Sequence, residues 1–151
     1  MLIPMKVDYG VRMLVHLAQQ PPDDAYASTA SIAEAQHIPE PYLLRICSEL
    51  QKAGLIDSRR GPQGGHRLAR ASENITVSDV VNSLDFSLAP LDCLFDAEEC
   101  TLSGACSQRE LWSDVEQLLM EHLNHVRISD LASKQRDMNS RRVAPVRTTF
   151  A

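Results

Sequence analysis

The chain has 151 residues, of which 44% are hydrophobic and 23% charged, and its formal net charge is −5. This size and apolar content allow one compact domain with an appendage, and the negative charge argues against a protein that coats nucleic acid indiscriminately. No apolar run approaches the roughly 18 residues of a membrane helix, and the opening residues lack the features of a secretion signal. We therefore expect a cytoplasmic protein that does not interact with membranes.

The charge is segregated along the chain. Residues 45–70 carry six basic and two acidic side chains, whereas residues 72–130 carry two basic and twelve acidic ones. A basic patch on an acidic body can attract a polyanion locally, although a solvated charged surface is the commoner role of such a cluster.

Three short helices are predicted in the first 53 residues. Apolar residues at helical spacing predict one helix over residues 7–20, which a Pro-Pro pair ends. Ser28 and Ser31 are alternative N-caps for a second helix, and Glu34 could complete a capping box with Ser31. Pro41 suits the first turn of a third helix that Gly54 closes in a left-handed conformation.

A hairpin follows the third helix. Residues 55–59 and 66–69 have strand character, and the Gly-Pro-Gln-Gly-Gly run between them predicts a tight turn. Two helices joined by a turn and followed by a glycine-rich hairpin with arginines at its tip are typical of a winged helix-turn-helix module. We predict a mainly α fold with a small β-hairpin wing, in which residues 1–85 form the DNA-binding domain.

The second half of the chain is predicted to hold two more helices. Thr76 and Asp79 fit a capping box that opens a fourth helix, and residues 86–107 form a cysteine-bearing loop. An apolar stripe then predicts a helix of about six turns from Ser107. This stripe needs a partner, so residues 108–134 are interpreted as a homodimer region, with internal packing as the alternative. Residues 135–151 are expected to form a flexible tail.

Cys93, Cys100 and Cys106 lie within one loop, separated by six and then five residues, whereas Cys47 falls in the third helix, where a buried role is expected. Thiolates bind soft or borderline metals, so the three loop cysteines are metal-ligand candidates. Their spacing matches neither a zinc ribbon nor a ferredoxin. The spacing leaves open a metal site of unspecified type, a structural zinc site or a thiol switch.

The sequence resembles the IscR/NsrR family of bacterial regulators. The residues that carry the resemblance are the hairpin run 55–68, residues 32–34, 38–43 and 75–81, and the three-cysteine loop, so it covers about residues 5–128. The resemblance implies a homodimeric transcription regulator of the repressor type, which places its third helix in a major groove and its wing near a minor groove of a pseudo-palindromic operator. It also implies a 2Fe-2S or 4Fe-4S iron-sulfur cluster on Cys93, Cys100 and Cys106, which senses redox state, nitric oxide or iron.

The fourth cluster ligand differs among members of this family. Arg109 stands where some members have a histidine, and arginine cannot ligate iron. The resemblance instead favours Asp8, reaching across to the partner's cluster; the alternative is that Asp8 is a helix N-terminal acid stabilised by the macrodipole. The gap between Cys93 and Cys100 is one residue longer than in the best-known members, which leaves the cluster type open.

Seven residues are predicted to contact double-stranded DNA: Ser31, Tyr42 and Arg45 on the helices, and Arg59, Arg60, Gln63 and His66 on the wing. Arg60 aligns with the arginine before the family's wing glycine, and a guanidinium suits a narrow minor groove. The alternatives are a solvated charge for Arg60 and pairing across the hairpin for His66. No nucleophile-base pairing, phosphate loop or C-x2-C motif supports an enzyme. The remaining alternative is a winged-helix regulator with a zinc or thiol-switch site and no iron-sulfur cluster.

Overall fold

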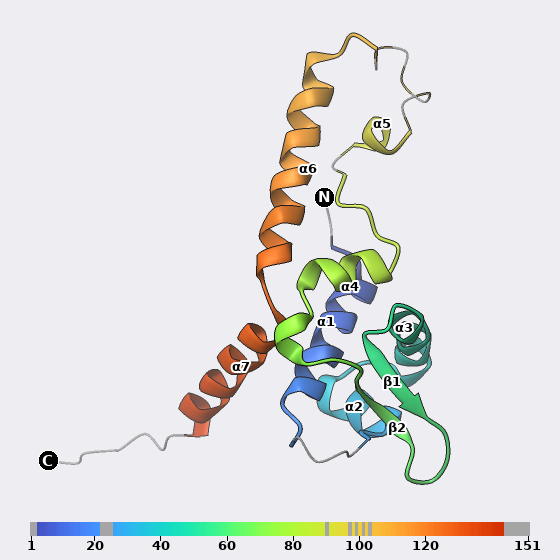
Figure 1. The fold of residues 1–151 in the computed structure, drawn as a ribbon, viewed down its shortest axis with the longest axis vertical. Helices are drawn as coiled ribbons and strands as arrows, with labels where there is room; N and C mark the ends of the chain where they lie inside the picture. Colours follow the sequence, from blue (N-terminus) through green and yellow to red (C-terminus); the bar gives the residue numbers. More distant parts are fainter. Residues whose placement is uncertain are drawn as a thin grey trace, which may run out of the picture.

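A helical body with a small antiparallel hairpin forms the N-terminal half of the computed structural model (Figure 1). The structure describes residues 3–21, 26–89, 91–96, 98, 100, 102 and 104–143. In chain order its elements are α1 Met5–Ala18, α2 Thr29–Gln36, α3 Glu40–Lys52, β1 Ile56–Arg59, β2 Gly65–Leu68, the 3-10 turn η1 Ser72–Asn74, α4 Val77–Ser83, α5 Asp92–Phe95, α6 Ser107–His125 and α7 Ile128–Val143. The predicted mainly α, winged-helix fold is confirmed.

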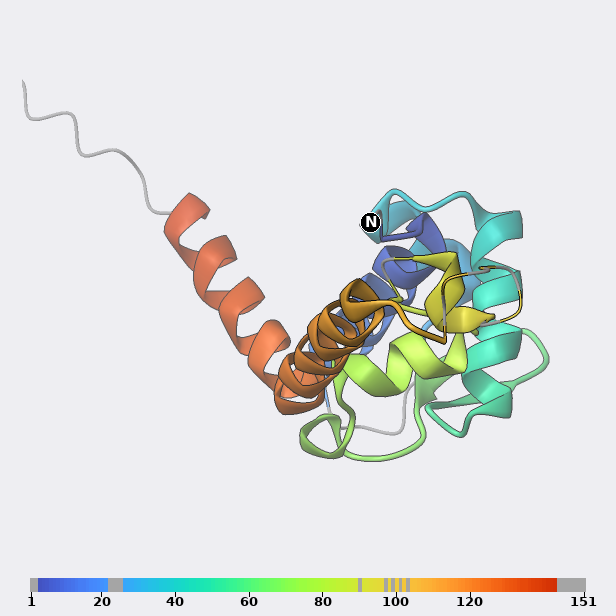
Figure 2. The same cartoon turned by 90° about the horizontal axis from the view of Figure 1, so that it is seen from above.

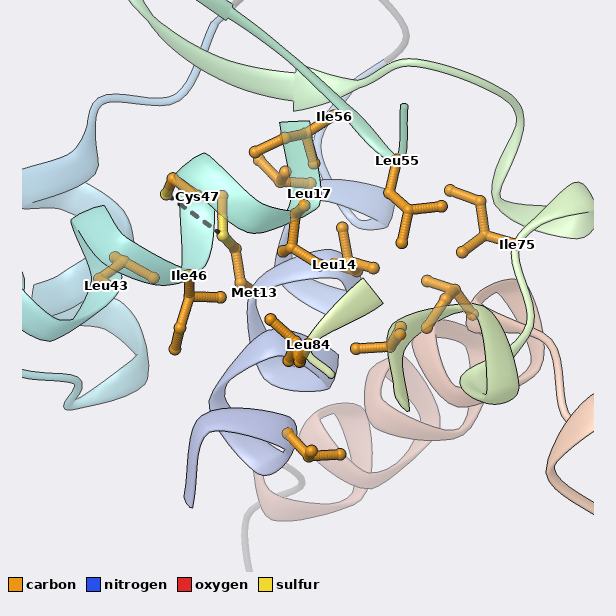
Figure 3. Packing of buried hydrophobic residues seen from close by; sticks show 14 of the residues in the cluster. Met13, Leu14, Leu17, Leu43, Ile46, Cys47, Leu55, Ile56, Ile75 and Leu84 are labelled. Carbon is orange, nitrogen blue, oxygen red and sulfur yellow. Dashed lines mark hydrogen bonds between the residues drawn. The ribbon is translucent and has the colours of Figure 1, made fainter. Parts of the chain in front are cut away.

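The core forms around α1, which contacts α2, α3, α4 and α7. Met13 and Leu14 of α1 are fully buried among apolar side chains of α3, β1 and α4 (Figure 3). Helices α1 and α4 approach closely at Gly10, because a Cβ there would lie 2.9 Å from Leu84 Cδ1 and 3.1 Å from Val80 Cγ1. A larger residue at position 10 would therefore push α4 away from α1.

Local signals set most of the helix ends. Ser28 caps α2 by accepting a hydrogen bond from the Ser31 backbone N–H at 3.1 Å, so the alternative capping box of Ser31 with Glu34 is wrong. The capping box between Thr76 and Asp79 is confirmed at the start of α4. Gly54 follows α3 with a φ of +68°, the left-handed conformation expected after a helix C-terminus.

Helix α6 projects from the body and is anchored at its C-terminal end (Figure 1). The Val77 N–H donates to Val126 O and the Ile128 N–H to Ile75 O, both at 2.9 Å. The Ser78 hydroxyl adds a hydrogen bond to Asn124 Oδ1 at 3.0 Å. No residue of α6 is buried. The end of α6 is thus fixed to α4, and Leu119, Met120 and Leu123 pack partly buried against the core. Leu111 and Leu118 of the apolar stripe remain exposed.

Residues 135–151 were expected to form a flexible tail, but α7 continues as a helix to Val143. Ile128 and Ala132 are buried against the body, and the Gln19 side chain donates to Ala132 O at 3.2 Å. These anchored first turns provide the nucleus from which the polar turns can extend. Helices α7 and α3 lie on opposite sides of α1 (Figure 2). Residues 144–151 fall outside the described part of the chain. Within the described residues, no helix has both the length and the apolar character needed to cross a bilayer.

Candidate nucleic-acid interface and cysteine loop

The hairpin of β1 and β2 has the geometry expected of a wing. Its strands pair antiparallel, with Arg59 opposite Gly65. Gly61 and Gly65 have φ values of +112° and +149°, conformations that favour glycine, so the tight tip depends on them. Arg59 and Arg60 are both exposed where β1 enters the turn. The wing therefore presents two guanidinium groups to solvent.

The predicted contact residues gather on two neighbouring surfaces of the body. Ser31, Arg59 and Gln63 line one hollow of about 720 Å³ between α2 and the wing. Arg60 lines a second hollow of about 510 Å³, between the wing and α3. Tyr42 and Arg45 are exposed on α3 and line neither hollow. The fold thus brings Ser31 of α2 close to the wing residues. Tyr42 and Arg45 lie outside both hollows, on α3.

His66 is placed differently from the prediction that it contacts DNA. Its side chain is only 8% exposed. Its ring nitrogens are hydrogen-bonded to Ser58 Oγ at 2.8 Å and to Thr29 Oγ1 at 3.0 Å. Burial lowers the pKa of this imidazole. The alternative of pairing across the hairpin matches the structure, because His66 faces Ser58 in the strand register.

An aromatic contact that the sequence did not indicate joins α1 to α3. The Tyr9 and Tyr42 rings meet edge to face with centroids 5.7 Å apart. The Arg12 guanidinium lies 5.7 Å from the centre of the Tyr9 ring and pairs with the Asp8 carboxylate at 2.8 Å. The spacing of four residues could have signalled the Asp8–Arg12 pair, but nothing local relates Tyr9 to Tyr42. Asp8 is thereby connected to an exposed tyrosine of α3.

The three loop cysteines lie between α4 and α6. Cys93 belongs to α5, which packs beside α6 (Figure 1), and Cys106 is the N-cap residue of α6. All three are half-buried, and none forms a disulfide. Cys106 and Arg109 line a hollow of about 640 Å³ at the start of α6. In the described part of the chain, no three His, Cys, Asp or Glu side chains converge closely enough to bind one metal ion.

The comparison with protein families decides the classification. A family model described as "Rrf2: Iron-dependent Transcriptional regulator" matches residues 3–134. This chain belongs to the Rrf2 family. The resemblance to IscR/NsrR regulators is confirmed, since solved structures similar to this Rrf2 chain include an IscR.

Similar proteins support the same classification. The chain is 34% identical to the protein rrf2 of Nitratidesulfovibrio vulgaris over 123 residues, covering 82% of this chain and 81% of that protein. It is 32% identical over 133 residues to the HTH-type transcriptional regulator CymR of Bacillus subtilis, covering 88% and 91%. The T. potens IscR structure matches with a TM-score of 0.73 and 29% identity, covering 99% of this chain and 97% of the other. The structure of B. subtilis CymR, the "Global Cysteine Regulator", matches with a TM-score of 0.71 and 30% identity, covering 89% and 98%.

Membership in the Rrf2 family establishes the general function. The chain is a DNA-binding transcription regulator with a winged helix, and the prediction that it is not an enzyme is confirmed by this family. The two hollows lie beside the wing, α2 and α3, which are elements of the winged helix-turn-helix.

The donor set of this Rrf2 chain suits a thiolate-bound metal group. Three half-buried thiols in one loop match, in number and kind, the donors used by iron-sulfur clusters and by zinc. Cys47 is a different kind of cysteine, because it is 3% exposed with its thiol 3.7 Å from Met13 Sδ (Figure 3). Burial raises the pKa of the Cys47 thiol to about 11, which keeps it protonated and unreactive.

Proposed function

We propose that this Rrf2 regulator is a cytoplasmic homodimer that represses transcription and whose operator affinity is set by an iron-sulfur cluster on Cys93, Cys100 and Cys106. The observation that carries this proposal is the set of three half-buried thiols in the segment that leads directly into α6. When bound, such a cluster supplies electron transfer and reactivity toward oxygen or nitric oxide, with iron at the site of ligand exchange. The sensed signal is redox state, nitric oxide or iron.

The proposed DNA contacts come from α2, α3 and the wing. Tyr42 and Arg45 on α3 would reach base edges or phosphates in a major groove. Arg60 would enter the adjacent minor groove, where a guanidinium is favoured electrostatically. Arg59, Gln63 and Ser31, which share one hollow, would hold the sugar-phosphate backbone. His66 is left out of this set because its ring is buried and hydrogen-bonded.

A homodimer within the predicted region 108–134 is supported by the exposed apolar residues of α6. Residues 128–134 of that region belong to α7, where Ile128 and Ala132 pack against the protein's own body. Leu111 is 55% exposed and Leu118 is 64% exposed on this helix. Large apolar side chains at that exposure on a long helix favour a second copy of the same helix as the covering surface. Such a dimer would carry two wings, as a pseudo-palindromic operator requires.

Two structural connections could carry the signal to the DNA-binding surface. The first is the end of α6, which is hydrogen-bonded to the residues around α4. The second starts at Asp8, the proposed fourth ligand to the partner's cluster. Asp8 pairs with Arg12, Arg12 lies against Tyr9, and Tyr9 contacts Tyr42 of α3. Recruiting the Asp8 carboxylate as a ligand would release Arg12 and change the support of Tyr42.

A second candidate keeps the DNA-binding function and replaces the cluster with structural zinc or a thiol switch. The thiol switch is favoured by the similarity to CymR of B. subtilis, which is described as the "Global Cysteine Regulator". Under this hypothesis, oxidation of two loop thiols or zinc binding would alter the approach to α6.

Anaerobic purification tests the proposal directly. A brown protein with visible absorbance, iron and acid-labile sulfide supports the cluster, and a colourless protein that contains zinc or no metal contradicts it. Single Cys93→Ser, Cys100→Ser and Cys106→Ser variants are expected to lose iron. The matched control is Cys47→Ser, which changes a cysteine outside the loop and is expected to keep it.

A further inference from the structure

The imidazole of His66 connects the wing to the first turn of α2. On one side it is hydrogen-bonded to Ser58 Oγ of β1 at 2.8 Å, within the hairpin. On the other side it is hydrogen-bonded to Thr29 Oγ1, the first residue of α2, at 3.0 Å. A neutral imidazole offers one donor and one acceptor, and a hydroxyl can complement either. Both ring nitrogens are thus satisfied without water.

The backbone around His66 is equally close to the segment before α2. The Ala27 N–H donates to His66 O at 3.0 Å, and the His66 N–H donates to Ala27 O at 2.8 Å. A Cβ at Gly65 would lie 2.2 Å from Ala27 O, so only glycine allows this approach. The base of the wing is therefore held against the start of α2 by main-chain and side-chain bonds together.

This attachment matters because the hairpin is small. Its two strands have four residues each, and an isolated two-stranded hairpin is marginally stable in water. The wing presents Arg60 at a fixed place relative to α3 only if something outside the hairpin fixes its angle. Among the described residues, the His66–Thr29 bond is a side-chain contact that links the strand to the helix-turn-helix.

We propose that His66 is a positioning residue that fixes the angle of the wing relative to α2, so that Arg60 and the α3 residues reach DNA at the same time. This inference rests on the proposed contact of Arg60 with DNA. The two hydrogen bonds of the His66 ring have different roles. The bond to Ser58 lies within the hairpin, and the bond to Thr29 holds the wing against the helix-turn-helix.

Double-mutant cycles test this assignment. The probe is a DNA duplex selected from a random-sequence pool by the wild-type protein, and binding is titrated at one salt concentration. Arg60→Ala is introduced into the wild type and into His66→Phe, Thr29→Val and Ser58→Ala backgrounds. Thr29→Val removes the bond to α2, and Ser58→Ala is the matched control that removes the bond within the hairpin.

The expected pattern separates positioning from general stability. Arg60→Ala is expected to weaken binding about tenfold in the wild type and in Ser58→Ala. In Thr29→Val and His66→Phe the same change is expected to weaken binding less than about threefold, because a displaced wing no longer delivers Arg60. Hydroxyl-radical footprints of Thr29→Val should lose minor-groove protection. Methylation of guanine N7 by dimethyl sulfate should still show protection by α3 in the major groove.

Two results would overturn the inference in distinguishable ways. A full tenfold cost of Arg60→Ala in Thr29→Val would show that the wing keeps its place without the bond, while leaving the Arg60 contact intact. No cost of Arg60→Ala in the wild type would remove Arg60 from the DNA contacts and the positioning role with it. If His66→Phe does not fold, the test rests on Thr29→Val. This variant is expected to fold, because Ser28 and not Thr29 caps α2.

Discussion

Tyr9 on α1 and Tyr42 on α3 meet edge to face, with ring centroids 5.7 Å apart and planes at 82°. Tyr9 also receives the Arg12 guanidinium, which pairs with Asp8. Tyr42, an exposed residue of the proposed recognition helix α3, thus contacts Tyr9, which directly follows the proposed cluster ligand Asp8. Under the proposed function, this contact would connect the cluster ligand on α1 to α3.

Replacing Tyr9 with Leu is expected to reduce the difference in operator affinity between cluster-loaded and cluster-free protein. The ring contact with Tyr42 and the cation–π contact with Arg12 are both lost, at a stability cost of about 1 kcal/mol. Fluorescence-anisotropy titration of both forms measures the difference. Tyr9→Phe keeps the ring and should behave as wild type; an unchanged difference in Tyr9→Leu would contradict this route.

Gly10→Ala is expected to destabilise the fold by about 1–3 kcal/mol, the usual cost of overpacking. The added methyl would meet Leu84 Cδ1 at 2.9 Å and Val80 Cγ1 at 3.1 Å in a packed core. Urea unfolding followed by circular dichroism measures the free energy. Gly104→Ala is the control, because a Cβ there meets nothing within 4 Å. Equal stability of the two variants would argue against a close α1–α4 contact.

Leu118→Glu is expected to convert a dimer into a monomer at micromolar concentration. A carboxylate in the proposed seam would be buried without a partner. Sedimentation equilibrium measures the mass. Met138→Glu is the matched control, since Met138 is 60% exposed, close to the 64% of Leu118, but lies on α7. A Leu118→Glu protein that remains dimeric would place the dimer interface elsewhere.

Stability is expected to fall as the pH drops below about 6.5, in part because of the buried imidazole of His66 and the half-buried imidazole of His16. Burial lowers the pKa of both His16 and His66 in the folded protein. The unfolded chain therefore binds protons first, so the histidine contribution is complete above the unfolded pKa and is lost as pH falls toward the folded value.

Urea unfolding at pH 7.5 and 5.5 checks this dependence. The His16→Gln/His66→Phe double variant is expected to lose less stability over this interval than the wild type does. His122→Gln changes an exposed histidine of α6 and should follow the wild type. Identical losses in the double variant and the wild type would assign the pH dependence to other groups.

The sequence by itself determined the order of α1 to α4, the hairpin and α6, together with several of their ends, because those depend on local interactions. It did not predict η1, α5 or α7. Ser28, Thr76 and Gly54 act through bonds or backbone angles within a few residues, and the glycines of the wing tip follow the same logic. The three-cysteine loop and the resemblance to IscR/NsrR regulators were likewise visible along the chain, and the comparison with family models shows the Rrf2 family.

Only the tertiary structure decided which residues far apart in the sequence are in contact. His66 was predicted to contact DNA, but its ring is buried and hydrogen-bonded to Thr29, which lies 37 residues away in the sequence. This bond connects the wing to α2. Tyr9 and Tyr42 meet because α1 and α3 pack together, and residues 135–143 are helical because α7 is anchored on α1. Strand alternation and helical periodicity specify which face of an element is buried, but the identity of the group on the other side depends on how the elements pack.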